Sequence, residues 1–232
     1  VIKKNNIDGL ILIGGDGTYK GGRVLCAQWK IPCIGVPGTI DNDLNGTDWT
    51  IGADTAINVA LDAIDKIRDT ATSMERIFVV EVMGRESGFI AIQVALGSGS
   101  EEVVIPEKKF DIQSMCHEIV EGNLRGKVSW IIITAEGAIG GHQLAKQITE
   151  NTDLEIRVVV LGHVQRGGSP TAQDRNLASR LGVAAVELLL KGESDKAVGI
   201  VADRLNVVSF EEATKPKPIN VDEFYRLIKI FT

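Results

Sequence analysis

The chain has 232 residues, of which 44% are hydrophobic, and a formal net charge of −6. This length and composition suit a globular protein with a sizeable core and exclude a disordered chain. The negative charge offers no general attraction for nucleic acid, so an anionic substrate needs a local cluster of arginine and lysine. Three cysteines without a CxxC pair favour buried thiols in a reducing cytosol over a disulfide framework or zinc site.

Short apolar runs typical of buried parallel strands recur along the chain, at residues 10–13, 33–36, 77–82, 103–106, 130–133, 158–161 and 198–201. Helical spacing of apolar residues lies between them, at residues 57–67, 115–120, 173–190 and from about 222 onward. This alternation predicts βαβ units with mainly parallel sheets. Ligands of such sheets bind beyond the carboxyl ends of the strands, which is where the glycine-rich and charged turns fall. No apolar run approaches the length of a membrane span.

The first such turn is the glycine-rich segment 14–22, which contains Asp16. Glycines let backbone N–H groups approach an anion closely, and the N-terminus of a following helix adds positive potential. The segment contains no GxxxxGK[ST] motif. It also does not match GxGxxG, because Lys20 occupies the position of the third glycine. A carboxylate inside a phosphate-binding loop indicates a Mg²⁺ ligand. The alternative is an ordinary strand-to-helix turn.

The second turn, at residues 37–43, carries Thr39, Asp41 and Asp43 at alternate positions. In an extended segment these three side chains point to one side. One aspartate can then accept a hydroxyl proton during phosphoryl transfer while the other helps to hold Mg²⁺. A solvated Asn/Asp turn is the alternative interpretation.

Two later turns supply basic side chains. Arg85 follows the strand at 77–82 and could bind a phosphate group. The alternative is a surface arginine in an ion pair with Glu86. His163 and Arg166 follow the strand at 158–161 and together suit a phosphate monoester, although a lone histidine is commonly structural. Glu136 offers a carboxylate that could bind sugar hydroxyls; the alternative is a solvated acidic residue in a loop.

Residues 215–218 are interpreted as a solvated linker.

Four motifs occur in register over essentially the whole chain: GGDGT from Gly14, PGTIDND from Pro37, VMGR from Val82 and GHVQRGGSP from Gly162. In their order and separation they resemble the bacterial 6-phosphofructokinases. The resemblance implies two Rossmann-like α/β lobes with mainly parallel sheets and flanking helices, and an active site in the cleft between them. It places residues 1–52 and 165–216 in a nucleotide-binding lobe, and residues 53–164 and 217–232 in a sugar-phosphate-binding lobe.

The resemblance also implies roles for individual residues. Gly15, Asp16, Gly17 and Thr18 are similar to the ATP phosphate loop, with Asp16 as a Mg²⁺ ligand. Asp41 resembles the base that activates the 1-hydroxyl of fructose 6-phosphate. Its neighbours at the transferring group are Thr39, Ile40 and Asp43, of which Asp43 is the second metal ligand.

The sugar phosphate site implied by the resemblance comprises Met83, Gly84, Arg85, Glu136, His163 and Arg166. Arg85 is also expected to act on the transition state. Arg76 and Arg157 match residues that reach the sugar phosphate from a neighbouring subunit, which implies a homotetramer. The effector site is matched only in part, by Arg68, Glu101, Arg125 and Lys127, because Val128 and Ser129 replace an expected basic run.

The donor is expected to be ATP. Pyrophosphate-using relatives carry Asp and Lys at the positions of Gly17 and Gly38, and a small residue leaves room for the α-phosphate of the nucleotide. The chain starts at Val1 and lacks the first strand and initial glycine loop of the family, so we expect an N-terminal truncation.

Other functions stay open at this point. They are a pyrophosphate-dependent phosphofructokinase, another GGDGT-loop kinase that acts on NAD or diacylglycerol, and a non-catalytic regulatory subunit. The presence of Asp16, Asp41 and Arg85 favours an active enzyme over the last of these.

Overall fold

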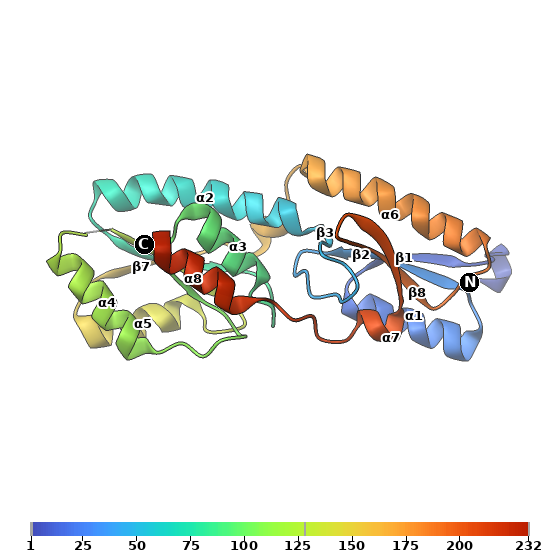
Figure 1. Cartoon of the computed structure of the whole chain (residues 1–232), viewed down its shortest axis with the longest axis horizontal. Helices are drawn as coiled ribbons and strands as arrows, with labels where there is room; N and C mark the ends of the chain where they lie inside the picture. The colour runs from blue at the N-terminus through green and yellow to red at the C-terminus, as the bar shows by residue number, and fades with distance from the viewer. Residues whose placement is uncertain (1, 128, 232) are drawn as a thin grey trace. The chain divides into compact units, whose positions relative to one another are not determined.

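The computed structural model describes residues 2–127 and 129–231 (Figure 1). The chain forms two compact units, Val1–Asp54 with Ser169–Pro218, and Thr55–Gly168 with Ile219–Thr232. The expectations that concern Val1 and Val128 lie outside the described residues. The mixed α/β architecture with mainly parallel sheets is confirmed.

The first unit contains a short 3₁₀ helix, five strands and three helices that belong wholly to it. Their bounds are η1 Lys3–Asn5, β1 Leu10–Gly14, α1 Asp16–Trp29, β2 Cys33–Thr39, β3 Ile51–Gly52, α6 Ala172–Leu190, β8 Lys196–Val201, β9 Arg204–Ser209 and α7 Phe210–Ala213. The strand order is β1-β2-β8-β9, with β3 paired to the end of β2. Strands β1, β3 and β8 run parallel to β2, and only β9 is antiparallel.

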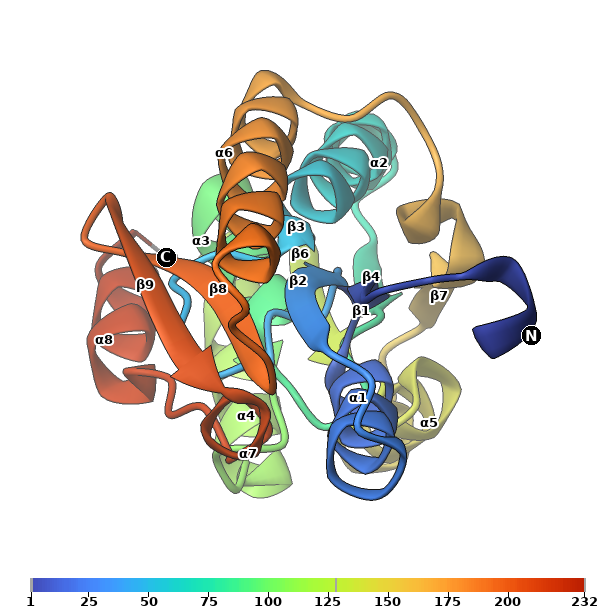
Figure 2. The ribbon, with the colours of Figure 1, turned by 90° about the vertical axis from the view of Figure 1, so that its right-hand side faces the viewer.

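Helices cover both faces of this sheet, with α6 on one face and α1 with α7 on the other (Figure 2). Ile34 and Val36 of β2 point into the core under α6, whereas Cys33 belongs to the core under α1 and α7. Burial on both faces explains why β2 reads as a continuous apolar run rather than an alternating one.

The second unit contains a four-stranded parallel sheet in the order β5-β6-β4-β7. Its elements are α2 Ala53–Ser73 (which begins in the first unit), β4 Ile77–Val82, α3 Phe89–Ser98, β5 Glu102–Val104, α4 Ile112–Leu124, β6 Trp130–Ala135, α5 Gly141–Thr152, β7 Ile156–Val160, η2 Gly162–Arg166 and α8 Val221–Phe231. The core beside α4 and α5 includes Val79, Ile132 and Leu144. Every residue of β6 is buried.

Helices α3, α5 and α7 and strand β9 were not among the elements expected from the sequence. Helix α3 buries Ile90, Ile92 and their neighbours on nearly all sides, so it has no amphipathic stripe to reveal it. Strand β9 was not predicted, because its tight turn from β8 uses Ala202 and Asp203 at positive φ rather than the usual Asn-Gly pair. Helix α5 has an apolar pattern at Leu144 and Ile148 that sequence reading could have found.

The interpretation of residues 215–218 as a solvated linker is wrong at Lys217. This side chain is half-buried, and its Nζ donates a hydrogen bond to the backbone oxygen of Asp48, at 3.1 Å. Burial lowers the pKa of Lys217 to about 8, although the carboxylates of Asp48 and Asp43 act in the opposite direction.

All three cysteines are free thiols; Cys33 and Cys116 are buried, and Cys26 is half-buried. Within residues 2–127 and 129–231, none of the helices combines the length and apolar character needed to cross a membrane.

Two adjacent glycines of α1 allow a stability test of the first unit. A methyl group on Gly22 would lie 2.5 Å from Leu12 Cδ1 and 2.9 Å from Phe210 Cε2, whereas one on Gly21 would meet nothing within 4 Å. We expect Gly22→Ala to destabilise the fold by about 1–3 kcal/mol through overpacking. Gly21→Ala, the matched control, should stabilise it by up to about 1 kcal/mol through helix propensity. Urea unfolding measures both; equal effects of the two changes would contradict the packing.

Candidate functional site

In the first unit, β1 leads directly into α1, and the turn between them carries the candidate phosphate loop. Gly15 is the N-cap of α1, and Asp16 is the first helical residue. The first backbone N–H groups of a helix have no intrahelical partner, and with the helix dipole they form an anion site. The candidate residues Gly15, Asp16, Gly17 and Thr18 therefore occupy the position where a phosphate would bind. Asp16 also forms an i,i+4 ion pair with Lys20, at 2.9 Å.

The second candidate loop follows β2, beside the first. A methyl group on Gly15 would lie 3.4 Å from Cβ of Thr39, so the glycine loop and the Thr39–Asp43 segment are in contact. Asp41 is 5% exposed, and its backbone N–H donates to Thr39 Oγ1, at 3.2 Å. The structure thus brings Gly15, Thr39 and Asp41 together at the carboxyl ends of two adjacent parallel strands.

Within the described part of the chain, no group of three or more His, Cys, Asp and Glu side chains is arranged to hold a metal ion. Asp16 and Asp43 each supply carboxylate oxygens, which are the ligand type that Mg²⁺ takes in proteins. Mg²⁺ is usually bound by one or two carboxylates together with substrate phosphates and waters. The two aspartates therefore suit an ion that is shared with a phosphate.

In the second unit, three loops meet at the carboxyl ends of β4, β6 and β7. Glu136 Oε1 accepts hydrogen bonds from the backbone N–H groups of Gly84, at 3.3 Å, and Arg85, at 3.0 Å. Gln165 Oε1 accepts one from the N–H of Met83, at 3.3 Å. These contacts bring together Met83, Gly84, Arg85, Glu136 and the η2 segment that carries His163 and Arg166.

The turn that presents Arg85 has an unusual backbone. Gly84 has φ +149° and Arg85 has φ +52°, both in the region that most L-residues avoid. The Glu136 carboxylate stabilises this turn because it satisfies two consecutive N–H groups. Glu136 thus holds the Arg85 turn in place. The sequence alone predicts only a contact of Glu136 with sugar hydroxyls and does not predict this role.

Two positions in these loops were missed by sequence reasoning. A methyl group on Gly137 would lie 1.6 Å from the backbone oxygen of Arg85, so the two backbones touch and only glycine fits. Gln165 is 1% exposed, and its Nε2 donates to the backbone oxygen of Gly162, at 3.1 Å. Gln165 lies inside the GHVQRGGSP motif, which was the available signal; Gly137 had only its place after Glu136.

Arg76 and Arg157 do not join this cluster. Arg76 precedes β4, and Arg157 lies opposite Phe78 near the amino end of the same sheet. The six residues of β4 separate that end from the Arg85 turn, which corresponds to about 17 Å at the rise of a strand. Arg157 forms an ion pair with Glu155, at 2.7 Å.

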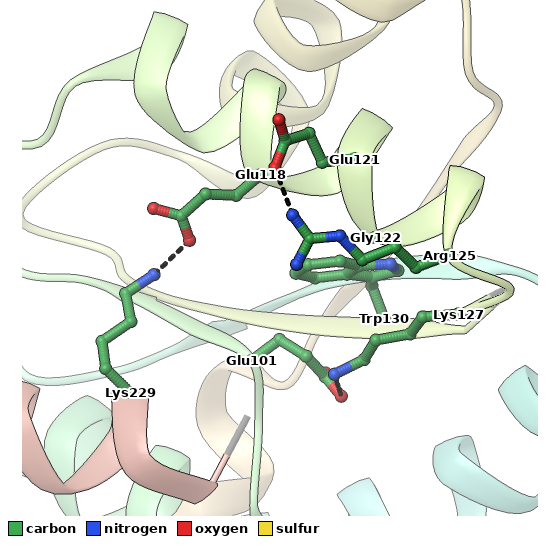
Figure 3. Close-up of a pocket in the computed structure, with 8 residues that line it drawn as sticks. All are labelled: Glu101, Glu118, Glu121, Gly122, Arg125, Lys127, Trp130 and Lys229. Atoms are coloured by element: carbon green, nitrogen blue, oxygen red, sulfur yellow. Dashed lines mark hydrogen bonds and ion pairs between the residues drawn. The ribbon is translucent and has the colours of Figure 1, made fainter.

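Three of the four candidate effector residues line one pocket of about 330 Å³ (Figure 3). In this pocket each of three cations lies beside a carboxylate, in the pairs Lys127–Glu101, Arg125–Glu121 and Lys229–Glu118. Arg68 is not among the lining residues; its guanidinium donates to the backbone oxygens of Ser98 and Gly99.

Comparison with known proteins agrees with this arrangement. The phosphofructokinase family model matches residues 1–189. Two curated proteins, both called ATP-dependent 6-phosphofructokinase, are 53% identical (Bacillus velezensis) and 52% identical (Bacillus mycoides). Each alignment covers 98% of this chain and 71% of the relative.

Solved structures give the same result. A phosphofructokinase from Saccharomyces cerevisiae matches with a TM-score of 0.83 and 30% identity, over 92% of this chain and 33% of the yeast chain. A pyrophosphate-dependent phosphofructokinase from Marinobacter aquaeolei matches with a TM-score of 0.77 and 26% identity, over 99% of this chain and 68% of that one. The four motifs, the two α/β units and these matches together show that the chain belongs to the phosphofructokinase family.

Proposed function

We propose that the chain transfers the γ-phosphoryl group of ATP to the 1-hydroxyl of fructose 6-phosphate, a reaction of glycolysis. The observation that carries this proposal is the contact between Gly15 and Thr39. It joins an anion site at a helix N-terminus to a loop with two aspartates, which is what a phosphoryl transfer site needs. The curated relatives with this name, at 51–53% identity, support the same reaction.

Each group in the first unit has a distinct task. Backbone N–H groups of residues 15–18 bind phosphate oxygens, helped by the dipole of α1. Asp41 accepts the proton of the attacking hydroxyl, and Thr39 lies beside the transferring group. Asp16 and Asp43 hold Mg²⁺, which when bound neutralises charge on the phosphates.

The glycine positions support ATP over pyrophosphate as the donor. A side chain at Gly17 would meet nothing within 4 Å, and with glycine at this position no carboxylate crowds or repels the α-phosphate of ATP. Gly38 differs, because a methyl group there would lie 2.8 Å from Ile13 Cγ2. A lysine at this position would not fit unless the Ile13 side chain moved.

The sugar phosphate is bound by the second unit in this proposal. Arg85 acts on the transferring group, Met83, Gly84 and Glu136 face the sugar, and His163 and Arg166, both exposed, bind its 6-phosphate. Arg76 and Arg157 lie at the opposite end of β4 and β7. We propose that they complete the sugar-phosphate site of a neighbouring copy in a homotetramer.

Further assignments follow from the same reaction. The first unit binds the nucleotide, the second binds the sugar phosphate, and the enzyme acts in the cytoplasm. We also propose that the pocket with Glu101, Arg125 and Lys127 binds an anionic effector, and that Arg68, which binds the backbone oxygens of Ser98 and Gly99, contributes to the same effector site. Such an effector has to displace carboxylates that already pair with these cations.

Replacing Asp41 by asparagine tests the proposed base. Asparagine keeps the size of the side chain but does not take a proton, so kcat should fall by about 10²–10⁴-fold while KM for both substrates changes little. A coupled assay of ADP release with fructose 6-phosphate and Mg²⁺ measures this. The exposed Asp8 provides the control Asp8→Asn, which should keep wild-type kinetics. Wild-type turnover by Asp41→Asn would reject Asp41 as the base.

Replacing Gly137 by alanine tests the turn that presents Arg85. The added methyl group overlaps the Arg85 carbonyl, so the turn must move, and kcat/KM for fructose 6-phosphate should fall by about 10²-fold. Gly97→Ala, in α3, is the control, because its methyl group would meet Leu61 at an ordinary 3.4 Å. Unchanged kinetics in Gly137→Ala would show that the turn does not matter for the reaction.

A further inference from the structure

The loop between β2 and β3, residues 40–50, carries Asp41 and Asp43 but has no helix or strand of its own. Loops are usually mobile, whereas a reacting group must be held within about 0.5 Å of its productive position. Several side chains of this loop are nevertheless buried, among them Asn42 at 2% exposure and Thr50 at 0%. Something inside the loop therefore fixes its conformation.

Asn42 makes the contacts that close this loop. Its Nδ2 donates to the backbone oxygen of Asp48, at 2.9 Å, and its Oδ1 accepts from the backbone N–H of Thr50, at 2.9 Å. One side chain thus satisfies a donor and an acceptor of the returning backbone. A carboxylate lacks the donor and an apolar group lacks both partners, whereas an amide carries the donor and the acceptor on two separate atoms.

The backbone of Asn42 is also unusual, with φ +50°. Asparagine is one of the few residues with a side chain that tolerate this region. Asn42 is joined by peptide bonds to Asp41 on one side and Asp43 on the other. The backbone direction that its side chain fixes therefore determines the direction in which both aspartates leave the chain.

The segment to which Asn42 binds is itself anchored. Thr50 Oγ1 donates to the backbone oxygen of Thr39, at 2.6 Å, which closes the base of the loop. At the far end, the Asp48 N–H donates to the Ile200 backbone oxygen, at 2.7 Å, and the Ile200 N–H donates to Thr47 Oγ1, at 3.1 Å. Asn42 thus connects the two aspartates to strand β8, through the segment 47–50.

We propose that Asn42 is a positioning residue for the reaction: its side chain holds the 40–50 loop so that Asp41 and Asp43 keep their working directions. This inference rests on the proposed function. It assigns Asn42 no contact with substrate. It predicts a loss in the chemical step rather than in substrate binding, because misplacement of a reacting group acts on kcat.

The test compares Asn42→Gly and Asn42→Ala with the wild type in the complete protein. Glycine accepts the positive φ but removes both hydrogen bonds, so it separates the role of the side chain from that of the backbone. Both variants should lower kcat by about 100-fold, while KM for ATP and for fructose 6-phosphate stays within about threefold. Asn6→Ala is the control, since Asn6 also has positive φ, at +49°, but lies outside the loop; it should keep wild-type kinetics.

A second measurement needs no activity. Hydrogen exchange at the Thr50 amide should be faster in Asn42→Gly than in the wild type, because its acceptor is gone. If the glycine and alanine variants do not fold, Asn42→Asp is informative. It keeps an acceptor for the Thr50 N–H but loses the donor to the Asp48 backbone oxygen, so kcat should fall.

The outcomes separate this inference from the proposed function. If the wild type shows no turnover with either ATP or pyrophosphate, the proposed function is rejected, and with it the predicted fall in kcat of the Asn42 variants. Hydrogen exchange at the Thr50 amide still decides whether Asn42 holds the loop. Turnover by the wild type with undiminished kcat in Asn42→Gly overturns the positioning role. So does a rise in KM at constant kcat, which would indicate substrate binding. Wild-type kcat in Asn42→Asp would overturn it as well.

Discussion

Each unit depends on the pairing of one buried parallel strand with neighbours on both sides. Strand β2 pairs with β1, β3 and β8, and β4 pairs with β6 and β7. These strands are apolar and covered by helices, and burial of an unpaired polar group is costly. Polar side chains are therefore accommodated mainly where the strands end. The candidate site residues after β2, β4, β6 and β7 lie at those carboxyl ends. The chemistry of the protein is thus concentrated there by the same burial that stabilises the sheets.

The loops at these ends are held by side chains that bind backbone groups. Asn42 closes the loop of Asp41, Glu136 holds the turn of Arg85, and Gln165 connects that turn to the η2 segment. A buried backbone N–H without a partner is costly, so each of these side chains restricts its loop to few conformations. The result is a set of irregular segments that are ordered without being helix or strand.

The sequence predicted the parts of the molecule that have a strong local signal. Continuous apolar runs identified β1, β2, β4 and β6, and four motifs identified the loops with Asp16, Asp41, Arg85 and His163. Helix α3 escaped because it is buried on nearly all sides, and β9 because its turn carries Ala202 and Asp203. The role of Asn42 depends on hydrogen bonds across its own loop, and that of Gly137 on backbone contact with the distant Arg85; neither leaves a periodic pattern. The same holds for Lys217, whose partner Asp48 lies 169 residues away.

The central claim is that this chain belongs to an enzyme that moves the γ-phosphoryl group of ATP onto the 1-hydroxyl of fructose 6-phosphate. The most direct measurement follows the label from ATP carrying a radioactive γ-phosphate, with fructose 6-phosphate and Mg²⁺, and identifies the labelled product. We expect the label on the phosphate at carbon 1 of fructose 1,6-bisphosphate. Label found only in inorganic phosphate, or on the bisphosphate only when labelled pyrophosphate replaces ATP, would contradict it.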